Sequence, residues 1–177
     1  IQALSGLMSL VGEPDGPPLR VGFPLVDMAA ANAAIQAILL ALYGRLQGRG
    51  GAEIDISLMS AALAMMSASY TRYRASGIVP KRQGNLNTNL APAGAYRAGD
   101  GRYLSIAVLR DSHWRKFCAV MGLHDLVEDP RFLTNADRVA NRADLIALLT
   151  ERTRTFARDS LLAELEKATV PAGPINS

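Results

Sequence analysis

The sequence predicts an α/β fold that changes to an α+β arrangement in its second half, and three observations carry this prediction. Apolar side chains recur at helical spacing over residues 28–47, residues 53–56 alternate as a short strand does, and residues 57–76 predict a second apolar helix. A helix, a glycine turn, a strand and a helix in this order are typical of an α/β layer. After residue 93 a hairpin pattern precedes several helical patterns.

The first predicted helix runs from Asp27 to about Gln47. It follows the irregular stretch GEPDGPPLRVGFP, whose prolines exclude a helix, and it ends at GRGG. We expect Ser57 to cap the second helix, because a serine side chain can accept a hydrogen bond from the free amides there. The stretch PKRQGNLNTNLAPAG then predicts a linker followed by an exposed loop.

The second half predicts a hairpin, with strands at 94–97 and 102–108 and a turn between them. A helix is expected to begin at Asp111 and to end at Gly122. One face of this helix is apolar and carries Trp114, Phe117, Cys118 and Met121.

More helices are expected toward the end of the chain. Thr134 or Asn135 provides a start signal, and helical patterns cover 142–153 and 158–168. The closing VPAGPINS is predicted to be extended, because each proline disfavours a helical conformation in the residue before it.

Composition excludes several classes of protein. The chain has 177 residues, 49% hydrophobic residues and a net charge of +3, which suits a globular core and gives no sign of nucleic-acid binding. One cysteine and two histidines predict neither an internal disulfide nor a metal site, and we expect a reducing, cytoplasmic compartment. Polar residues interrupt the apolar runs 28–43 and 57–70, so both are predicted to be buried helices and not membrane spans.

The two ends of the chain lack the features of natural termini. The first residues have no basic start and no apolar core of a signal peptide, and the chain does not begin with methionine. The last residues carry no polar tail. We therefore expect this sequence to be the interior of a longer protein.

Asp27 is the strongest candidate for a reactive group. A carboxylate at the start of a helix lies near free backbone amides and the positive end of the helix dipole, which suits a helix cap. The same amides could stabilise an oxyanion if the carboxylate attacked a carbonyl group. The residues alone leave both interpretations open.

A basic stretch runs from Arg72, near the end of the second helix, to Arg82, and no acidic residue between Asp55 and Asp100 balances its charge. Four of its side chains are candidate ligands for the phosphates of a substrate: Arg72, Arg74, Lys81 and Arg82. The alternative is a solvated helix end and linker, since basic residues also complement the helix dipole.

The loop NLNTNLAPAG is the other candidate for substrate binding. Its side-chain amides, on Asn85, Asn87 and Asn89, could donate hydrogen bonds to a bound substrate. The alternative is a plain connection between two elements.

Four blocks of the sequence resemble the class III CoA-transferases, in the order in which that family has them. They read QALSGLMSLVGEPDGPPLRVGFPLVD, GRGGAEIDISLMSAAL, KRQGNLNTNLAPAGAYRAGDGRYLSIAV, and EDPRFLTNADRVANR with VPAGPINS. The family includes the relatives of formyl-CoA transferase, carnitine CoA-transferase and α-methylacyl-CoA racemase. The resemblance covers nearly the whole chain.

The resemblance implies a Rossmann-like large domain and a smaller α+β domain. Residues 1–76 are then part of the large domain, 77–93 are linker and loop, and 94–177 are the small domain without its C-terminal return to the large domain. The resemblance also implies a homodimer in which two chains thread through each other as interlocked rings.

A reaction is implied as well. In the transferases, the aspartate that matches Asp27 attacks an acyl-CoA thioester to form a mixed anhydride, and it then carries coenzyme A as a thioester. A carboxylic acid reverses these steps and leaves as the new acyl-CoA. No permanently bound cofactor is implied, and loop 85–94 is expected to shield the intermediate.

Three departures from the family affect these expectations. After Asp27 the run DMAAANAA has Ala31 and Asn32 near the place where many members have glycine. The pair Gly84-Asn85 continues as LNTNLAPAG, where formyl-CoA transferase has a run of glycines, so we expect a stiffer loop and an acid other than formate or oxalate. The N-terminal portion that supplies most contacts to coenzyme A in the family is absent.

Two alternatives accompany the transferase. A racemase moves the α-proton with an aspartate and a histidine aided by a glutamate, and Arg110 stands where that glutamate is expected, which favours the transferase over a racemase or acyl-CoA isomerase. The other alternative is a non-catalytic fragment that folds only with a partner chain. The apolar helices over 28–47 and 57–76 would otherwise expose a patch that drives association.

Overall fold

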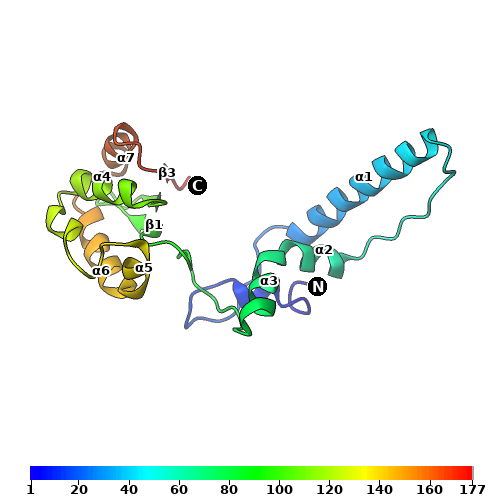
Figure 1. The fold of residues 1–177 in the computed structure, drawn as a ribbon, viewed down its shortest axis with the longest axis horizontal. Coiled ribbons are helices and arrows are strands. Elements are labelled where there is room, and N and C mark those ends of the chain that lie inside the picture. Colours follow the sequence, from blue (N-terminus) through cyan, green and yellow to red (C-terminus); the bar gives the residue numbers. More distant parts are fainter. Residues whose placement is uncertain (177) are drawn as a thin grey trace. The chain divides into compact units, whose positions relative to one another are not determined.

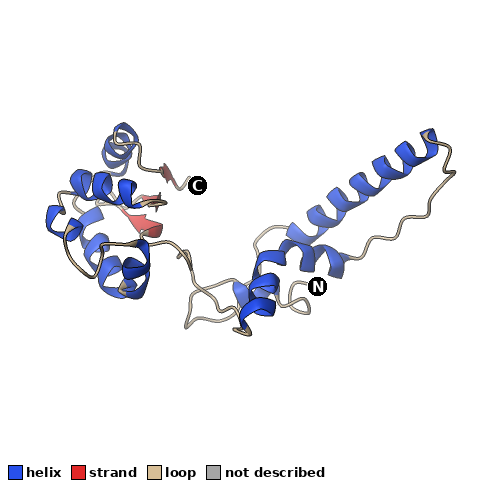
Figure 2. Ribbon diagram, in the orientation of Figure 1, coloured by secondary structure: helices blue, strands red, loops and turns tan. Residues whose placement is uncertain are grey.

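The computed structural model describes residues 1–176, which fall into two compact units, 1–84 and 85 onward. The boundary after Gly84 lies inside the segment 77–93 that the sequence predicts as linker and loop. Among the described residues, strands occur only in the second unit (Figure 2).

The first unit is helical. Its elements are η1 (Leu7–Leu10), α1 (Leu25–Leu46), α2 (Leu58–Met65) and α3 (Ser67–Ser76). The start of α1 lies beside α2 (Figure 1), and a small core joins Leu7, Val26 and Ala62 from η1, α1 and α2. This core fixes the beginning of α1, where Asp27 lies.

The apolar side chains of α1 are mostly exposed, whereas the sequence predicts that they are buried. Leu40 is 71% exposed and Leu46 is 84% exposed. The helix has 22 residues, so by length and composition it is long and apolar enough to cross a membrane, whereas the polar residues in this run predict a buried helix. Only 11% of its most apolar stretch is buried in the described structure, because this unit packs against α1 mainly through α2.

Two predictions for this unit are wrong. Residues 53–56 form no strand, because in the described structure no second strand lies beside them, and a strand persists only where its backbone groups are paired. The helix predicted over 57–76 is divided at Met66, which leaves helical geometry (φ −96°, ψ 10°) and packs against the small core. The predicted cap is confirmed, since the Ser57 hydroxyl accepts a hydrogen bond from the Ser60 N–H over 3.3 Å.

A three-stranded antiparallel sheet organises the second unit. It consists of β1 (Ala93–Arg97), β2 (Tyr103–Ala107) and β3 (Ala172–Pro174), in the order β1-β2-β3. The predicted hairpin is confirmed, with Ala95 opposite Ser105. Within the closing segment, Ala172–Pro174 is extended as predicted and forms the third strand, with Gly173 opposite Ser105, and Ser177 lies outside the described residues.

Helices gather around this sheet (Figure 1). They are α4 (Asp111–Met121), η2 (His124–Val127), α5 (Asn135–Ala140), α6 (Arg142–Thr153) and α7 (Arg158–Lys167). The predicted apolar face of α4 is confirmed, because Trp114, Phe117, Cys118 and Met121 are all buried in the core of this unit. From β2, Leu104 and Ile106 enter the same core, while Tyr103 and Ser105 face outward in the alternation of a strand.

Candidate active site

Asp27 is the third residue of α1 and not its cap. Pro24 is the N-cap (φ −76°, ψ 60°), and no side-chain hydrogen bond caps the helix. The Leu25 N–H donates to the Phe23 carbonyl over 2.8 Å, which closes a tight turn around Pro24 and starts the helix two residues earlier than the sequence predicts. The cap interpretation of Asp27 is therefore wrong.

The carboxylate of Asp27 is free of contacts with other polar groups in the described structure. The residue is exposed, and within residues 1–176 its side chain has no hydrogen bond and no ion pair. The Leu25 N–H donates to the Phe23 carbonyl and the Met28 N–H donates to the Pro24 carbonyl. The N–H groups of Val26 and Asp27, between them, have no acceptor among the described residues. The carboxylate thus lies beside free amides at the positive end of a 22-residue helix.

Packing of the neighbouring residue directs Asp27 outward. Val26 is 4% exposed and contacts the core with Leu7 and Ala62. Successive side chains of a helix diverge by about 100°, so a buried Val26 leaves the next side chain at the surface. The preceding segment is fixed too, because the Val21 N–H donates to Gln2 Oε1 over 3.0 Å.

The structure does not bring the four basic candidates together. Arg72 and Arg74 are both exposed on α3, and a separation of two residues places them about 200° apart around the helix, on opposite sides. Lys81 is exposed in the following segment. These three residues keep free cationic groups at the surface but share no face.

The side chain of Arg82 binds two backbone carbonyl groups of the first unit. Its Nη2 donates to the Gly16 carbonyl over 2.8 Å and its Nε to the Glu13 carbonyl over 3.2 Å. The Gly84 N–H donates to the Gly12 carbonyl over 2.9 Å. Arg82 therefore holds the loop 12–16 against the end of the first unit, whereas the sequence predicts only a candidate phosphate ligand at this position.

The three asparagines of the loop lie in the second unit and are exposed. Asn87 Oδ1 accepts from the Asn89 N–H over 2.9 Å, so this oxygen closes a local turn, while the Nδ2 group stays free to donate. The Asn87 N–H also donates to the Ala93 carbonyl over 3.1 Å. The loop is thus ordered by its own bonds as well as by bonds from helices.

Sequence reasoning missed the residues that hold this loop. Asn135, Arg138 and Arg142 all donate to its backbone carbonyls. The only signal was local, since the start at Thr134 is confirmed: Thr134 accepts from the Asp137 N–H over 3.2 Å, and its own N–H donates to Asp137 Oδ2 over 3.0 Å. Nothing in the sequence pattern connects this helix start to a loop some 44 residues earlier.

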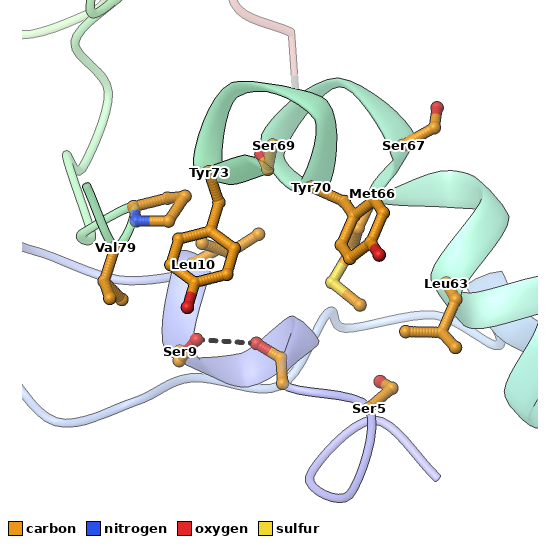
Figure 3. A pocket seen from close by; sticks show the side chains of 12 residues that line it. Ser5, Ser9, Leu10, Leu63, Met66, Ser67, Ser69, Tyr70, Tyr73 and Val79 are labelled. Atoms are coloured by element: carbon orange, nitrogen blue, oxygen red, sulfur yellow. Dashed lines mark hydrogen bonds between the residues drawn. The ribbon is translucent and has the colours of Figure 1, made fainter. Parts of the chain in front are cut away.

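An apolar groove of about 470 Å³ lies in the first unit (Figure 3). η1, the end of α2, α3 and the following segment line it, through side chains that include Leu10, Met66, Tyr70, Tyr73 and Val79. None of the predicted site residues lines this groove.

Cys118 is not a nucleophile. Burial in the apolar core raises the pKa of its thiol to about 12, so the thiolate is scarce at neutral pH. Across the described part of the chain, no cluster of His, Cys, Asp and Glu could hold a metal ion.

Comparisons with known proteins agree on one family. The family described as "CoA-transferase family III" matches residues 1–177. The chain is 33% identical over its whole length to a succinate–glutarate CoA-transferase of Agrobacterium fabrum, of which it covers 44%. It is 36% identical to an acetyl-CoA:oxalate CoA-transferase of Acetobacter aceti, over 99% of this chain and 45% of that protein.

A solved structure supports the same assignment. The crystal structure of a CaiB/BaiF family protein from Brucella suis has 42% sequence identity and a TM-score of 0.86, over 99% of this chain and 46% of that one. This likeness confirms the predicted α/β class. The chain spans about half the length of the curated relatives it matches. It belongs to CoA-transferase family III.

Proposed function

We propose that the full-length protein transfers coenzyme A from an acyl-CoA to a carboxylic acid, with Asp27 as the covalent acceptor. Membership of the family supports the transfer reaction. The observation that carries the assignment to Asp27 is its exposed, uncommitted carboxylate beside free amides at the start of α1.

The first half of the proposed reaction loads coenzyme A onto the enzyme. An oxygen of the Asp27 carboxylate attacks the thioester carbonyl carbon of the donor, the C–S bond breaks, and a mixed anhydride and free CoA thiolate result. The thiolate then attacks the aspartyl carbonyl carbon of the anhydride. The donor acid leaves with the aspartyl oxygen, and coenzyme A remains on Asp27 as a thioester.

The second half runs the same steps with another acid. The acceptor carboxylate attacks the aspartyl thioester and expels CoA thiolate, which forms a second mixed anhydride. The thiolate attacks the acyl carbonyl of that anhydride, the new acyl-CoA leaves, and the Asp27 carboxylate is restored. Each step exchanges one leaving group for one nucleophile, so no oxidant, metal or bound cofactor enters the balance.

The first turn of α1 suits this chemistry electrostatically. Each attack places negative charge on a carbonyl oxygen next to Asp27, and preorganised N–H donors stabilise such charge. The N–H groups of Val26 and Asp27 have no described acceptor and are candidate donors. The helix dipole favours negative charge at the same end.

The substrates are proposed from the relatives. One relative is named for succinate and glutarate and another for oxalate, so we propose a short dicarboxylic acid as acceptor. The relative named for oxalate lends no support to the expectation that oxalate is excluded. Oxalate therefore belongs among the acids to be tested beside succinate and glutarate.

The remaining roles are proposed from the resemblance. Loop 85–94 shields the intermediate, and Arg72, Arg74 and Lys81 are candidates for contact with the phosphates of coenzyme A, whereas Arg82 is engaged in the contact with loop 12–16. The full-length protein is a cytoplasmic homodimer with interlocked chains. Its large domain covers the apolar face of α1, which places that helix inside a soluble protein.

The test is covalent capture on the full-length gene product. The enzyme is incubated with succinyl-CoA without an acceptor, quenched and digested, and the peptide that contains Asp27 is examined by mass spectrometry. We expect a CoA adduct, or a hydroxamate after hydroxylamine treatment, that disappears when glutarate is added. Asp27→Asn and Asp27→Ala lose both adduct and transfer.

Asp55→Asn is the matched control, because Asp55 is also an exposed aspartate of the first unit. It should keep the adduct. An unmodified Asp27 peptide together with exchange of the α-proton of a 2-methylacyl-CoA would assign the protein to racemase or isomerase chemistry. Neither adduct nor exchange would leave a non-catalytic role.

A further inference from the structure

Four successive carbonyl groups of loop 85–92 are bonded to donors on α5 and α6. The donors and distances are Arg142 Nη2 to Thr88 O at 3.0 Å, Asn135 Nδ2 to Asn89 O at 2.8 Å, Arg142 Nη2 to Leu90 O at 3.5 Å, and Arg138 Nε to Ala91 O at 2.7 Å. A loop with this many long-range bonds to rigid helices is held at more points than a plain connection requires.

The side chain of Asn135 both donates a hydrogen bond to the loop and accepts one from it. Its Nδ2 donates to Asn89 O, and its Oδ1 accepts from the Ala91 N–H over 3.2 Å. One side chain thus satisfies a carbonyl and an amide two residues apart, as a neighbouring strand would. The cap formed by Thr134 and Asp137 fixes the first residue of α5, which is Asn135 itself.

Arg138 fixes the end of the loop from inside the core. Its side chain is fully buried, its Nη1 donates to Phe132 O over 3.0 Å, and its guanidinium group lies 5.0 Å from the centre of the Trp114 ring. If the loop moved, the Nε–H that now bonds Ala91 O would lose its partner in the core. Such an unpaired buried charge-bearing group is strongly unfavourable.

The underside of the loop is packed as well. Leu86 and Leu90 line one small internal space together with Tyr96, Arg142 and other residues. A Cβ atom on Gly94 would lie 3.0 Å from Asn85 O and 3.3 Å from Leu86 Cδ2, so the loop lies directly against β1. Hydrogen bonds and apolar contacts therefore hold the same conformation.

We propose that Asn135, Arg138 and Arg142 are positioning residues that hold loop 85–92 in one conformation before substrate binds. The loop is then a fixed rim and not a lid that closes during the reaction. Its carbonyls are withdrawn toward the helices, while the side chains of Asn85 and Asn89 are exposed. A loop whose carbonyls are bonded to helices and whose side-chain amides are free to donate suits a carboxylate, because a carboxylate only accepts hydrogen bonds. The consequence for catalysis rests on the proposed function, in which this loop shields the intermediate.

Hydrogen exchange on the substrate-free full-length protein tests the fixed conformation itself. The amides of Asn87, Asn89 and Ala91 are bonded and should exchange slowly. Asn135→Ala removes two bonds to the loop and should speed exchange in the peptide that covers 85–92 by about tenfold or more. Asn141→Ala is the matched control, because Asn141 also bonds two carbonyls, those of Arg131 and Asp137, but none of the loop. Its loop peptide should exchange as in the unchanged protein.

The catalytic consequence is read from the ratio of acyl-CoA hydrolysis to CoA transfer. A variant that is merely less stable loses both reactions in parallel, because fewer molecules are active, and its ratio stays constant. A loosened rim admits water to the intermediate, so Asn135→Ala should raise the ratio by about tenfold, following the population of the open loop. Asn135→Asp keeps the acceptor for the Ala91 N–H, so its ratio should lie between that of the unchanged protein and that of Asn135→Ala.

Arg142 provides a second pair of variants should Asn135→Ala fail to fold. Arg142→Ala should raise loop exchange and the hydrolysis ratio, and Arg142→Lys should restore part of both. Loop amides that exchange as fast as an unstructured peptide in the unchanged protein would overturn the fixed rim. Faster loop exchange in both alanine variants with an unchanged ratio would overturn the positioning role. Slow loop exchange in a protein that forms no covalent adduct would refute the proposed function while the fixed conformation stands.

Discussion

Arg138 donates a hydrogen bond over 2.8 Å to the carboxylate of Asp111, and the two partners differ in their exposure to solvent. The Arg138 side chain is fully buried, whereas that of Asp111 is 58% exposed. The pair therefore has its cation in the core and its anion at the surface. The other hydrogen bonds of Arg138 run from its Nε and Nη1 groups to the backbone carbonyls of Ala91, Phe132 and Leu133.

Arg138→Met should destabilise the second unit strongly. The substitution removes the donor of Asp111 and of the buried carbonyls of Ala91 and Phe132, and each buried acceptor that is left unpaired costs about 1–3 kcal/mol. Urea unfolding followed by the fluorescence of Trp114, the only tryptophan, measures this unit. Asp111→Asn keeps an acceptor oxygen and should cost about 1–2 kcal/mol. A loss below about 1 kcal/mol for Arg138→Met would contradict the assigned role.

Gly99→Ala should also destabilise this unit, for a steric reason. A Cβ at this position would overlap the backbone carbonyl oxygen of Arg154, which cannot rotate away as a side chain can. Overpacking of this kind costs about 1–3 kcal/mol. Gly173→Ala is the control, since a Cβ there meets nothing within 4 Å. Equal stability of the two variants in thermal unfolding would contradict a close approach of the Arg154 carbonyl to Gly99.

Arg82→Ala should loosen the junction at the end of the first unit. Two hydrogen bonds to the carbonyls of Glu13 and Gly16 disappear, so the segment 77–84 opens more often. Limited proteolysis should cleave that segment about fivefold to tenfold faster, the factor expected for bonds worth about 1–1.4 kcal/mol in total. If instead proteolysis is unchanged and the KM for acyl-CoA rises, Arg82 binds substrate and does not act as a structural contact.

The stability of α5 should depend on pH through Asp137. The hydroxyl of Thr134 and then its backbone N–H hold the pKa of this carboxyl below its ordinary value of 3.8. The contribution of Asp137 to stability is complete above that ordinary value and is lost as pH falls through the lower value in the folded state. The difference in stability between the unchanged protein and Asp137→Ala should therefore shrink as the pH is lowered below 3.8. A constant difference over this range would contradict the assignment.

Elements with local signals could be predicted from the sequence. The helix over 111–121 has an apolar stripe and a glycine behind it, and the structure gives Gly122 a left-handed conformation (φ 65°) after α4. The caps formed by Ser57 and Thr134 are predictable because each cap hydrogen bond joins residues only three apart in the sequence. Such signals need no knowledge of the rest of the chain.

Features that depend on distant partners could not be predicted. The alternation over 53–56 predicts a strand only if a second strand lies beside it. Arg138 was missed because arginine is rarely buried and its acceptors include Ala91, 47 residues away. The predicted helix start makes Asp27 the candidate reactive group, but its predicted role as a cap is wrong because a turn at Pro24 starts the helix earlier.

If Asp27 carries the transferred group, oxygen atoms must pass from the acceptor acid to its carboxylate, and isotopic labelling follows them. The full-length enzyme is cycled with succinyl-CoA and glutarate whose carboxylates carry isotopically labelled oxygen. Because each turnover leaves one oxygen of the acceptor on the aspartate, we predict one labelled oxygen in the Asp27 peptide after a single turnover, and label in the succinate that later turnovers release. Transfer of coenzyme A to glutarate with no label on Asp27 would contradict the account.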